Sequence, residues 1–182
     1  MGRPVRGLLV GRFQPFHGGH LAVVRHLRAE RGDERLILGI GSAQESYTAA
    51  NPFTAGERFE MIEQALAEAA VAGVSIVPIP DIQRHTEWVA YVTGLLPPFE
   101  RVYTNNPLTR LLFERARVEV VSPPTYDRGR FEGVRIRGQM ASGGDWRAAV
   151  PPAVARFLDS VNGAARVKML EAPDAPGRHG PG

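Results

Sequence analysis

The chain has 182 residues, of which 43% are hydrophobic and 23% are charged, so it can build one domain with a full core but not two ordinary domains. The absence of cysteine excludes disulfides and thiolate-bound metal. The net charge of +3 comes mainly from arginines scattered along the chain, which argues against a nucleic-acid-binding surface. No apolar run is long enough to span a membrane or to form a signal peptide, so we expect a cytoplasmic protein with no membrane partner.

Five short segments rich in Leu, Ile and Val are predicted to be strands. They show little alternation of polar and apolar residues, which is typical of parallel strands buried on both faces of a sheet. The segments are Gly7–Gly11, Arg35–Gly41, Val74–Ile79, Arg101–Thr104 and Val118–Ser122.

Helical patterns separate these strands. Each is marked by apolar residues three or four apart or by an N-terminal capping signal. In chain order the signals are Leu21-Val24-Leu27, the candidate capping box of Thr54 and Glu57, the segment Glu87–Leu96, and Asn106-Pro107 as N-cap and first helical residue. The alternation of strand and helix over about the first 125 residues predicts a Rossmann-like, doubly wound α/β fold with a parallel five-stranded sheet.

The last part of the chain changes character. Asp145–Arg147 and then Pro152 are predicted to open short C-terminal helices, and Asn162-Gly163 is predicted to end the last of them. From residue 173 onward the sequence is rich in Pro and Gly and nearly free of apolar residues. We therefore expect a single domain at 1–172 and a disordered tail at 173–182.

The segment GRFQPFHGGH, from Gly11 to His20, directly follows the first predicted strand. Its glycines suit a turn from strand to helix, and His17 and His20 fall on one face where the helix begins. A helix N-terminus favours phosphate through its free N–H groups and its dipole, so two imidazoles and Arg12 at that place suit polyphosphate chemistry. The histidine pair is a weak signal for metal, because the sequence offers no cysteine and no obvious third ligand, and no protein-bound metal site is predicted.

Polar and aromatic residues after the other strands are further candidates. Ser42 follows the second strand, where open α/β sheets bind ligands, so we expect it in a ligand-binding loop. The role of Arg58 stays open between pairing with a carboxylate and reaching a phosphate. Trp88 either stacks on an aromatic ring at the mouth of a nucleotide cleft or belongs to the core. Only one of Arg135 and Arg137 is expected to face the cleft, because residues two apart separate around a helix.

The GRFQPFHGGH block resembles the (H/T)xGH signature of the nucleotidylyltransferase superfamily, in the form typical of archaeal-type nicotinamide-nucleotide adenylyltransferases. The blocks GSAQ, NPFTAGER, DI followed by WV, and GDWR are also typical of that family and occur in the right order. The likeness runs from about Arg6 to Val167. It implies a nucleotidylyltransferase-type fold and an enzyme that joins nicotinamide mononucleotide (NMN) to ATP, giving NAD and pyrophosphate, with Mg²⁺ accompanying ATP and usually as a homohexamer.

The resemblance also implies roles for individual residues. His17 and His20 would contact the ATP phosphates, Arg12 would bind the triphosphate, and Arg137 takes the place of a late phosphate-binding arginine. The expected site therefore comprises His17, His20, Arg12 and Arg137 for catalysis, Gly11, Phe13, Gln14, Ser42 and Asn106 for ATP and NAD, and Asp81, Ile82 and Trp88 for nicotinamide. The attacking phosphate is already anionic, so such a site needs positioning and positive charge rather than a strong base.

Two departures from the family pattern leave alternatives open. Ala50 stands where a basic residue is common, and Glu132-Gly133-Val134 replaces a Ser-Gly-Thr type motif before the late arginine. The alternatives are adenylyl transfer to another phosphorylated acceptor, such as pantetheine or flavin phosphate, and a catalytically silent nucleotide-binding module. Trp88 and the Asp81-Ile82 pair favour a small aromatic amide over a long polar acceptor.

Overall fold

The computed structural model describes residues 5–30, 35–127 and 129–172. Strands and helices alternate along these residues, and each predicted strand is present within one residue of its expected bounds. The elements are β1 (Arg6–Gly11), α1 (Gly18–Glu30), β2 (Arg35–Ile40), α2 (Ala55–Glu68), β3 (Val74–Pro78), α3 (His85–Leu95), β4 (Arg101–Tyr103), α4 (Pro107–Arg115), β5 (Glu119–Val121), α5 (Gly133–Ser142), the 3₁₀ helix η1 (Arg147–Ala149), α6 (Pro152–Ser160) and α7 (Gly163–Glu171).

The strands form one parallel sheet in the order β3-β2-β1-β4-β5. β1 lies at its centre, where Leu8 pairs with Ile37 of β2 and with Val102 of β4. The chain builds one side of the sheet after β1 and then crosses to the other side with β4. The loops at the carboxyl ends of β1 and β4 therefore diverge, and this is the place where open α/β sheets bind ligands. The predicted fold class is confirmed.

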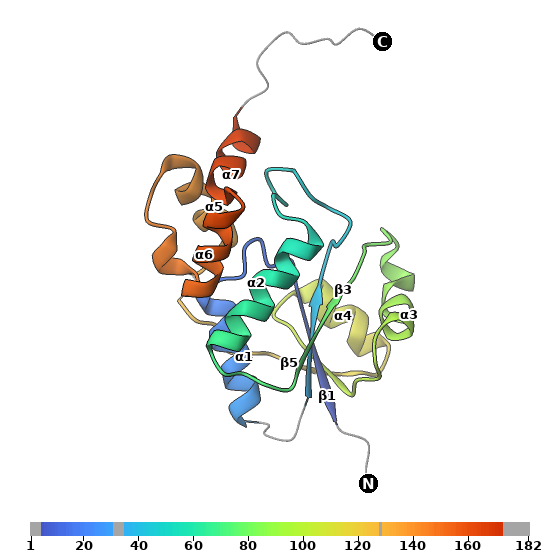
Figure 1. Cartoon of the computed structure of the whole chain (residues 1–182). Helices are drawn as coiled ribbons and strands as arrows, with labels where there is room; N and C mark the ends of the chain where they lie inside the picture. The colour runs from blue at the N-terminus through green and yellow to red at the C-terminus, as the bar shows by residue number, and fades with distance from the viewer. Residues whose placement is uncertain (1–4, 31–34, 128, 173–182) are drawn as a thin grey trace, which may run out of the picture.

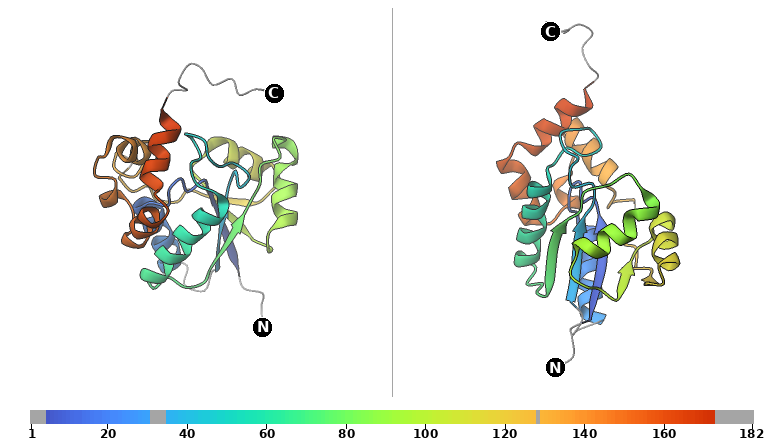
Figure 2. Two further views of the ribbon diagram at one scale, coloured as in Figure 1. Left: turned by 45° about the horizontal axis from the view of Figure 1, so that its top comes forward. Right: turned by 90° about the vertical axis from the view of Figure 1, so that its right-hand side faces the viewer.

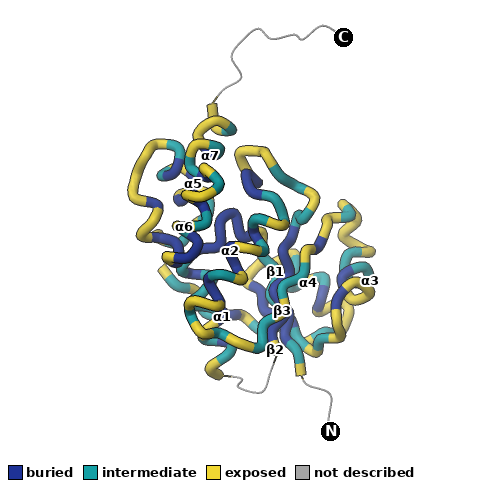
Figure 3. Tube along the Cα trace, viewed as in Figure 1, coloured by how far each residue is buried: buried dark blue, intermediate teal, exposed yellow. Residues whose placement is uncertain are grey.

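Helices cover both faces of the sheet, α1 and α2 on one face and α3 and α4 on the other (Figures 1 and 2). The first layer buries Val24 of α1 and Ile62 of α2, and the second buries Val92 of α3 and Phe113 of α4. Each such side chain stabilises the fold by about 1.5–3 kcal/mol when it is fully removed from water. In Figure 3 the buried residues follow the strands and continue into the loops at their carboxyl ends. The core thus extends up to the edge where ligands are expected.

Capping residues fix where two helices begin, as predicted. The Thr54 hydroxyl accepts a hydrogen bond from the Glu57 N–H at 3.1 Å, and the Glu57 carboxylate accepts one from the Thr54 N–H at 2.9 Å. Asn106 accepts the Thr109 N–H at 2.9 Å, and Pro107 is the first residue of α4. Both caps hold the preceding loop at the carboxyl edge of the sheet.

The C-terminal helices form a separate group, in which α5 packs against α7 and α6 packs against α2 (Figure 1). Pro152 opens α6 as predicted, and the short helix expected near Asp145–Arg147 is η1. No helix in the described part of the chain is long and apolar enough to cross a membrane.

The prediction that the last helix ends at Asn162-Gly163 was wrong. Asn162 does adopt a left-handed conformation with φ of 53° after α6, but α7 begins at the next residue. The only buried residues of α7 are Gly163 and Val167, so its sequence carries almost no apolar pattern. The predicted tail at 173–182 lies outside the described residues.

Candidate active site

The two histidines of the GRFQPFHGGH segment lie against each other at the start of α1. Their rings are stacked, with centroids 3.5 Å apart and planes 13° apart. The His17 N–H donates to Nδ1 of His20 at 3.2 Å, and the His20 N–H donates to Nδ1 of His17 at 3.3 Å. Because each Nδ1 accepts a hydrogen bond from a backbone N–H, the proton of each neutral ring is on Nε2.

Burial keeps both imidazoles neutral. It lowers the pKa of His17 from 6.5 to about 4. The pKa of His20 is lowered well below its usual value, mainly by burial and further by His17. At neutral pH the pair therefore offers two N–H donors at a helix N-terminus rather than two positive charges.

A cavity of about 190 Å³ opens beside the histidines, between the loops that follow β1, β4 and β5. Gly11, Phe13, His17 and His20 line it, as does Asn105. The sequence analysis missed one wall of this cavity. That wall is Pro123, Pro124, Thr125, Tyr126 and Phe131. The Pro-Pro pair directly after the fifth predicted strand was a usable signal, because it lies at the same edge of the sheet as the other loops.

Phe131 closes over the start of α1. Its ring stacks on His17, with centroids 6.1 Å apart and planes 17° apart. A Cβ atom at Gly18 would come within 2.7 Å of the Phe131 ring, and one at Gly19 within 2.8 Å of the Phe131 Cβ. The two glycines therefore allow an aromatic side chain to approach the helix and shield the His17 ring from water.

Arginines surround the first loop. Arg12 is exposed at the tip, whereas Arg137 is buried and donates to the Gln14 carbonyl at 2.8 Å. Burial, and secondly the charge of Arg12, lowers the pKa of Arg137. Arg135 on the same helix is exposed, so the two arginines lie on different sides of α5. That only one of them faces the cleft stays a prediction.

Two of the predicted residues tie the loops together. The Gln14 amide donates to the Phe53 carbonyl at 2.8 Å and accepts the Phe53 N–H at 3.0 Å, which joins the first loop to the NPFTAGER segment.

Arg58 is fully buried, and neither interpretation left open by the sequence holds. It reaches no carboxylate, and its guanidinium is surrounded by backbone carbonyls.

A second cavity, of about 280 Å³, brings Asp81, Trp88 and Asn106 together. The Ser42 hydroxyl donates to the Asp81 carboxylate at 2.6 Å, so the loop after β2 supports this cavity. Trp88 contacts Phe113 edge to face at 5.6 Å and lines the cavity as well. It therefore packs on the core, and its stacking on a nucleotide ring stays a prediction. Ile82 does not line this cavity and lies on a neighbouring hollow of α3.

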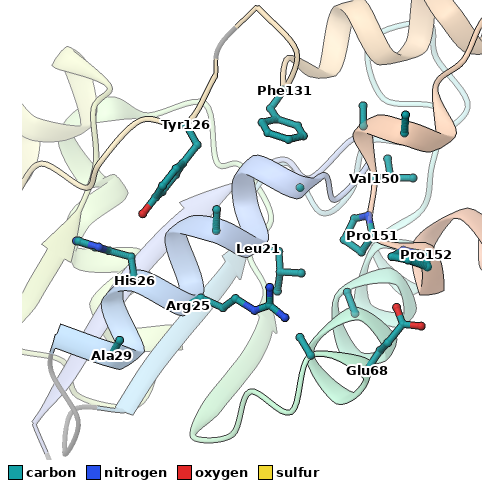
Figure 4. Close-up of a pocket in the computed structure, with 16 residues that line it drawn as sticks. Leu21, Arg25, His26, Ala29, Glu68, Tyr126, Phe131, Val150, Pro151 and Pro152 are labelled. Atoms are coloured by element: carbon teal, nitrogen blue, oxygen red, sulfur yellow. The ribbon is translucent and has the colours of Figure 1, made fainter.

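A larger hollow, of about 700 Å³, lies between α1, α2 and the segment 148–152 (Figure 4). Phe131 and Tyr126 form the wall that it shares with the histidine cavity, and apolar residues such as Leu21 and Val150 make up most of its surface. It contains none of the residues predicted for the site.

The two departures from the family pattern are both at the surface. Ala50 is exposed in the loop between β2 and α2, and Val134 is 64% exposed in the first turn of α5. Neither residue contributes to the core, so both can be replaced without disturbing the fold.

Residues 8–138 match the model of the cytidylyltransferase-like family, a stretch that holds almost the whole sheet and both cavities. The fold and the site thus make the protein a nucleotidyltransferase. Relatives of similar length show which family of nucleotidyltransferases the chain resembles. The nicotinamide-nucleotide adenylyltransferase of Picrophilus torridus is 45% identical over 170 residues, which are 93% of this chain and 99% of the relative. That of Halobacterium salinarum is 46% identical over 172 residues, which are 94% and 96% of the two chains.

The chain belongs to the nicotinamide-nucleotide adenylyltransferase family, as its resemblance predicted, and the prediction that it is an enzyme is confirmed. A crystal structure of a bifunctional NMN adenylyltransferase/ADP ribose pyrophosphatase from Francisella tularensis, complexed with AMP and a manganese ion, has the same fold, with a TM-score of 0.67. The amino-acid sequences of the two proteins are 20% identical, and the match covers 92% of this chain and 52% of the other, longer chain.

Proposed function

We propose that this protein transfers the AMP moiety of ATP to NMN, giving NAD and pyrophosphate. The observation that carries the proposal is that neighbouring residues of the loop between β4 and α4 line two different cavities. Asn105 lines the cavity at the histidines, and its neighbour Asn106 lines the cavity at Asp81 and Trp88. An enzyme that joins two mononucleotides needs two adjoining places of this kind, and the names of the relatives suggest which two mononucleotides they hold.

In the proposed reaction a phosphate oxygen of NMN attacks the α-phosphorus of ATP in line. The new P–O bond forms while the bond from the α-phosphorus to the oxygen bridging the β-phosphate breaks, and pyrophosphate leaves with that oxygen. No proton has to be removed from the attacking group. The protein therefore contributes positioning and stabilisation of negative charge.

The residues around α1 suit that task. The neutral His17 and His20 rings can donate their Nε2–H groups to phosphate oxygens at a helix N-terminus, where the dipole favours anions. Arg12 and Arg137 add positive charge. Arg137 is held in place by its bond to Gln14, so its charge is preorganised rather than recruited during the reaction.

The second cavity suits the nicotinamide group. One oxygen of Asp81 accepts the Ser42 hydroxyl, and the other can accept a hydrogen bond from a carboxamide NH₂. Trp88 offers an aromatic surface for stacking in the same cavity.

Mg²⁺ would arrive with ATP as part of the substrate. The described residues include no group of three His, Asp or Glu side chains that could hold a metal ion, and the side chains nearest the expected phosphates are imidazoles and guanidiniums. Its ligands would therefore be phosphate oxygens and water, which Mg²⁺ prefers, and it would neutralise charge on the departing pyrophosphate. A homohexamer and a cytoplasmic location belong to the same proposal and rest on the family resemblance.

The direct test is incubation with ATP, Mg²⁺ and one phosphorylated acceptor at a time, with pyrophosphate release and product mass as readouts. NMN should give NAD, and phosphopantetheine and flavin mononucleotide should give no adduct. An adduct of either of these without NAD would favour the alternative acceptor, and the absence of any product would favour a silent nucleotide-binding module.

A further inference from the structure

Arg58 has an unusual set of partners for a charged residue. It lies in α2 and is fully buried, with 0% of its surface exposed. Its three nitrogens make five hydrogen bonds, as many as a guanidinium has N–H groups. The acceptors are the backbone carbonyls of Arg12 (3.0 Å), Gly41 (2.8 Å), Ser42 (3.1 Å), Glu45 (3.4 Å) and Thr54 (3.2 Å).

None of these acceptors carries a negative charge. Burial, and secondly the charge of Arg12, lowers the pKa of Arg58 from 12.5 to about 10, so the residue is still protonated at neutral pH. Burying a charge without a carboxylate is an expensive way to stabilise a protein, and an apolar side chain is often no worse. Nor does Arg58 serve to start its helix, because Thr54 and Glu57 already form the capping box. A contribution to stability alone therefore does not account for this residue.

The bonds of Arg58 connect the two halves of the site. The Arg12 carbonyl belongs to the loop that carries the exposed Arg12 guanidinium beside the histidine cavity. The Ser42 carbonyl belongs to a residue with a left-handed φ of 47°, whose hydroxyl bonds to Asp81 in the second cavity. One rigid, planar group thus sets the backbone of both loops at once. A lysine could supply the charge but not this fan of five directed donors.

We infer that Arg58 is a positioning residue that fixes the Arg12 loop and the Ser42 loop relative to each other, so that both substrates are aligned for the reaction. The inference rests on the proposed function for the identity of the substrates. Misplacement of reacting groups by about 1 Å can cost 10²-fold in rate, so the effect of disturbing this residue should appear in catalysis.

The test compares Arg58→Lys with Arg166→Lys as a matched control. Arg166 also lies beside the start of α2, where it pairs with Glu57 at 2.7 Å, and it reaches Tyr47 and Pro52 in the later part of the β2–α2 loop. Among the described residues its hydrogen bonds go to Glu57 and Pro52, and none goes to Arg12 or to residues 41–45. We expect both variants to lose some thermal stability. Only Arg58→Lys should lower kcat/KM for NMN, by about 10- to 100-fold per folded molecule, with folding checked by circular dichroism. A folded Arg58→Lys enzyme whose kcat and KM values stay within twofold of the wild type would overturn the inference, as would an equal loss in Arg166→Lys.

Ser42→Ala keeps the inference testable if Arg58→Lys does not fold. It leaves the carbonyl bonded to Arg58 intact and removes only the link to Asp81. The KM for NMN should rise about tenfold while the KM for ATP stays unchanged, the size expected for one lost hydrogen bond to a charged group. An unchanged KM for NMN would contradict the link from the Ser42 loop to the second cavity, without which Arg58 cannot align both substrates.

Calorimetric titration with Mg²⁺ and α,β-methylene-ATP separates this inference from the proposed function. If the wild type binds this analogue but makes no NAD, the proposed function fails. Weaker binding by Arg58→Lys than by Arg166→Lys would still support the positioning role through Arg12, and equal binding by both would overturn it.

Discussion

The Nδ1 atoms of His17 and His20 each accept a hydrogen bond from the backbone N–H of the other residue, at 3.2 and 3.3 Å. This reciprocal pairing uses up one nitrogen of each ring and leaves both Nε2–H groups available to a ligand. Two stacked, neutral imidazoles thus become fixed donors at a helix N-terminus. Fixed donors cost no reorganisation when negative charge develops during the reaction.

His20→Ala should retain the fold and lose turnover by about 10²–10³, the scale for removing one preorganised donor in a transition state. His26→Ala is the control, since His26 lies on the same helix and pairs with Glu30 at the surface. Steady-state kinetics of both variants provide the measurement. Near-normal turnover of a folded His20→Ala protein would remove this residue from the proposed mechanism.

His17 should make the protein less stable in mild acid. Its pKa is about 4 in the folded protein and 6.5 in the unfolded chain, so between these pH values the unfolded state binds a proton that the folded state does not. The free energy of unfolding therefore rises with pH in this window, by about 1.4 kcal/mol per pH unit for this group. The stability that the protein has with His17 neutral is fully present above pH 6.5 and is progressively lost as the pH falls to 4. Urea denaturation should show a shallower pH dependence for His17→Asn, and equal slopes for the two proteins would contradict the burial argument.

Trp88→Ala should raise the KM for NMN much more than the KM for ATP, because the indole lines the cavity of Asp81 and not the cavity of the histidines. Some stability should be lost as well, since Trp88 contacts Phe113. Phe113→Leu is the matched control, because it disturbs the same core contact without lining the cavity. If both variants only lower the melting temperature and leave both KM values alone, Trp88 is a core residue without a binding role.

Asp81 should make the enzyme prefer NMN over nicotinic acid mononucleotide. The acid carries a carboxylate in place of the carboxamide, and two carboxylates in one cavity repel each other. Asp81→Asn should reduce the ratio of kcat/KM for NMN to kcat/KM for nicotinic acid mononucleotide by about tenfold or more. The reason is that one charged contact is worth roughly 1.5–3 kcal/mol. An unchanged ratio would mean that Asp81 does not face the nicotinamide substituent.

The amino-acid sequence predicts most of the fold and the first loop of the site because their signals are local. The buried strands, the capping box at Thr54 and the N-cap at Asn106 each depend on residues within one or two turns. The role of Arg58 could not be predicted, since its acceptors are backbone carbonyls whose positions depend on how two loops far apart in the sequence fold together. Helix α7 was missed because it buries too few side chains to leave a pattern.

The wall formed by Pro123 and Phe131 illustrates a different reason. Its residues follow β5, a strand of three residues, and none of them is a Lys, Arg, His, Asp or Glu that would mark a site. Their contribution is shape and exclusion of water around His17, which depends on the close approach that Gly18 and Gly19 permit. A sequence pattern can indicate reactive or charged residues, but it does not indicate which apolar residues will pack around them.

The most direct test of the whole account is a crystal structure of the protein with NAD bound. The account predicts the nicotinamide ring in the cavity of Asp81 and Trp88, with its carboxamide on the Asp81 carboxylate, and the pyrophosphate within hydrogen-bond distance of Nε2 of His17 or His20. The adenine should occupy the cavity walled by Pro123 and Phe131. A nicotinamide bound outside the Asp81 cavity, or a pyrophosphate away from both histidines, would contradict it.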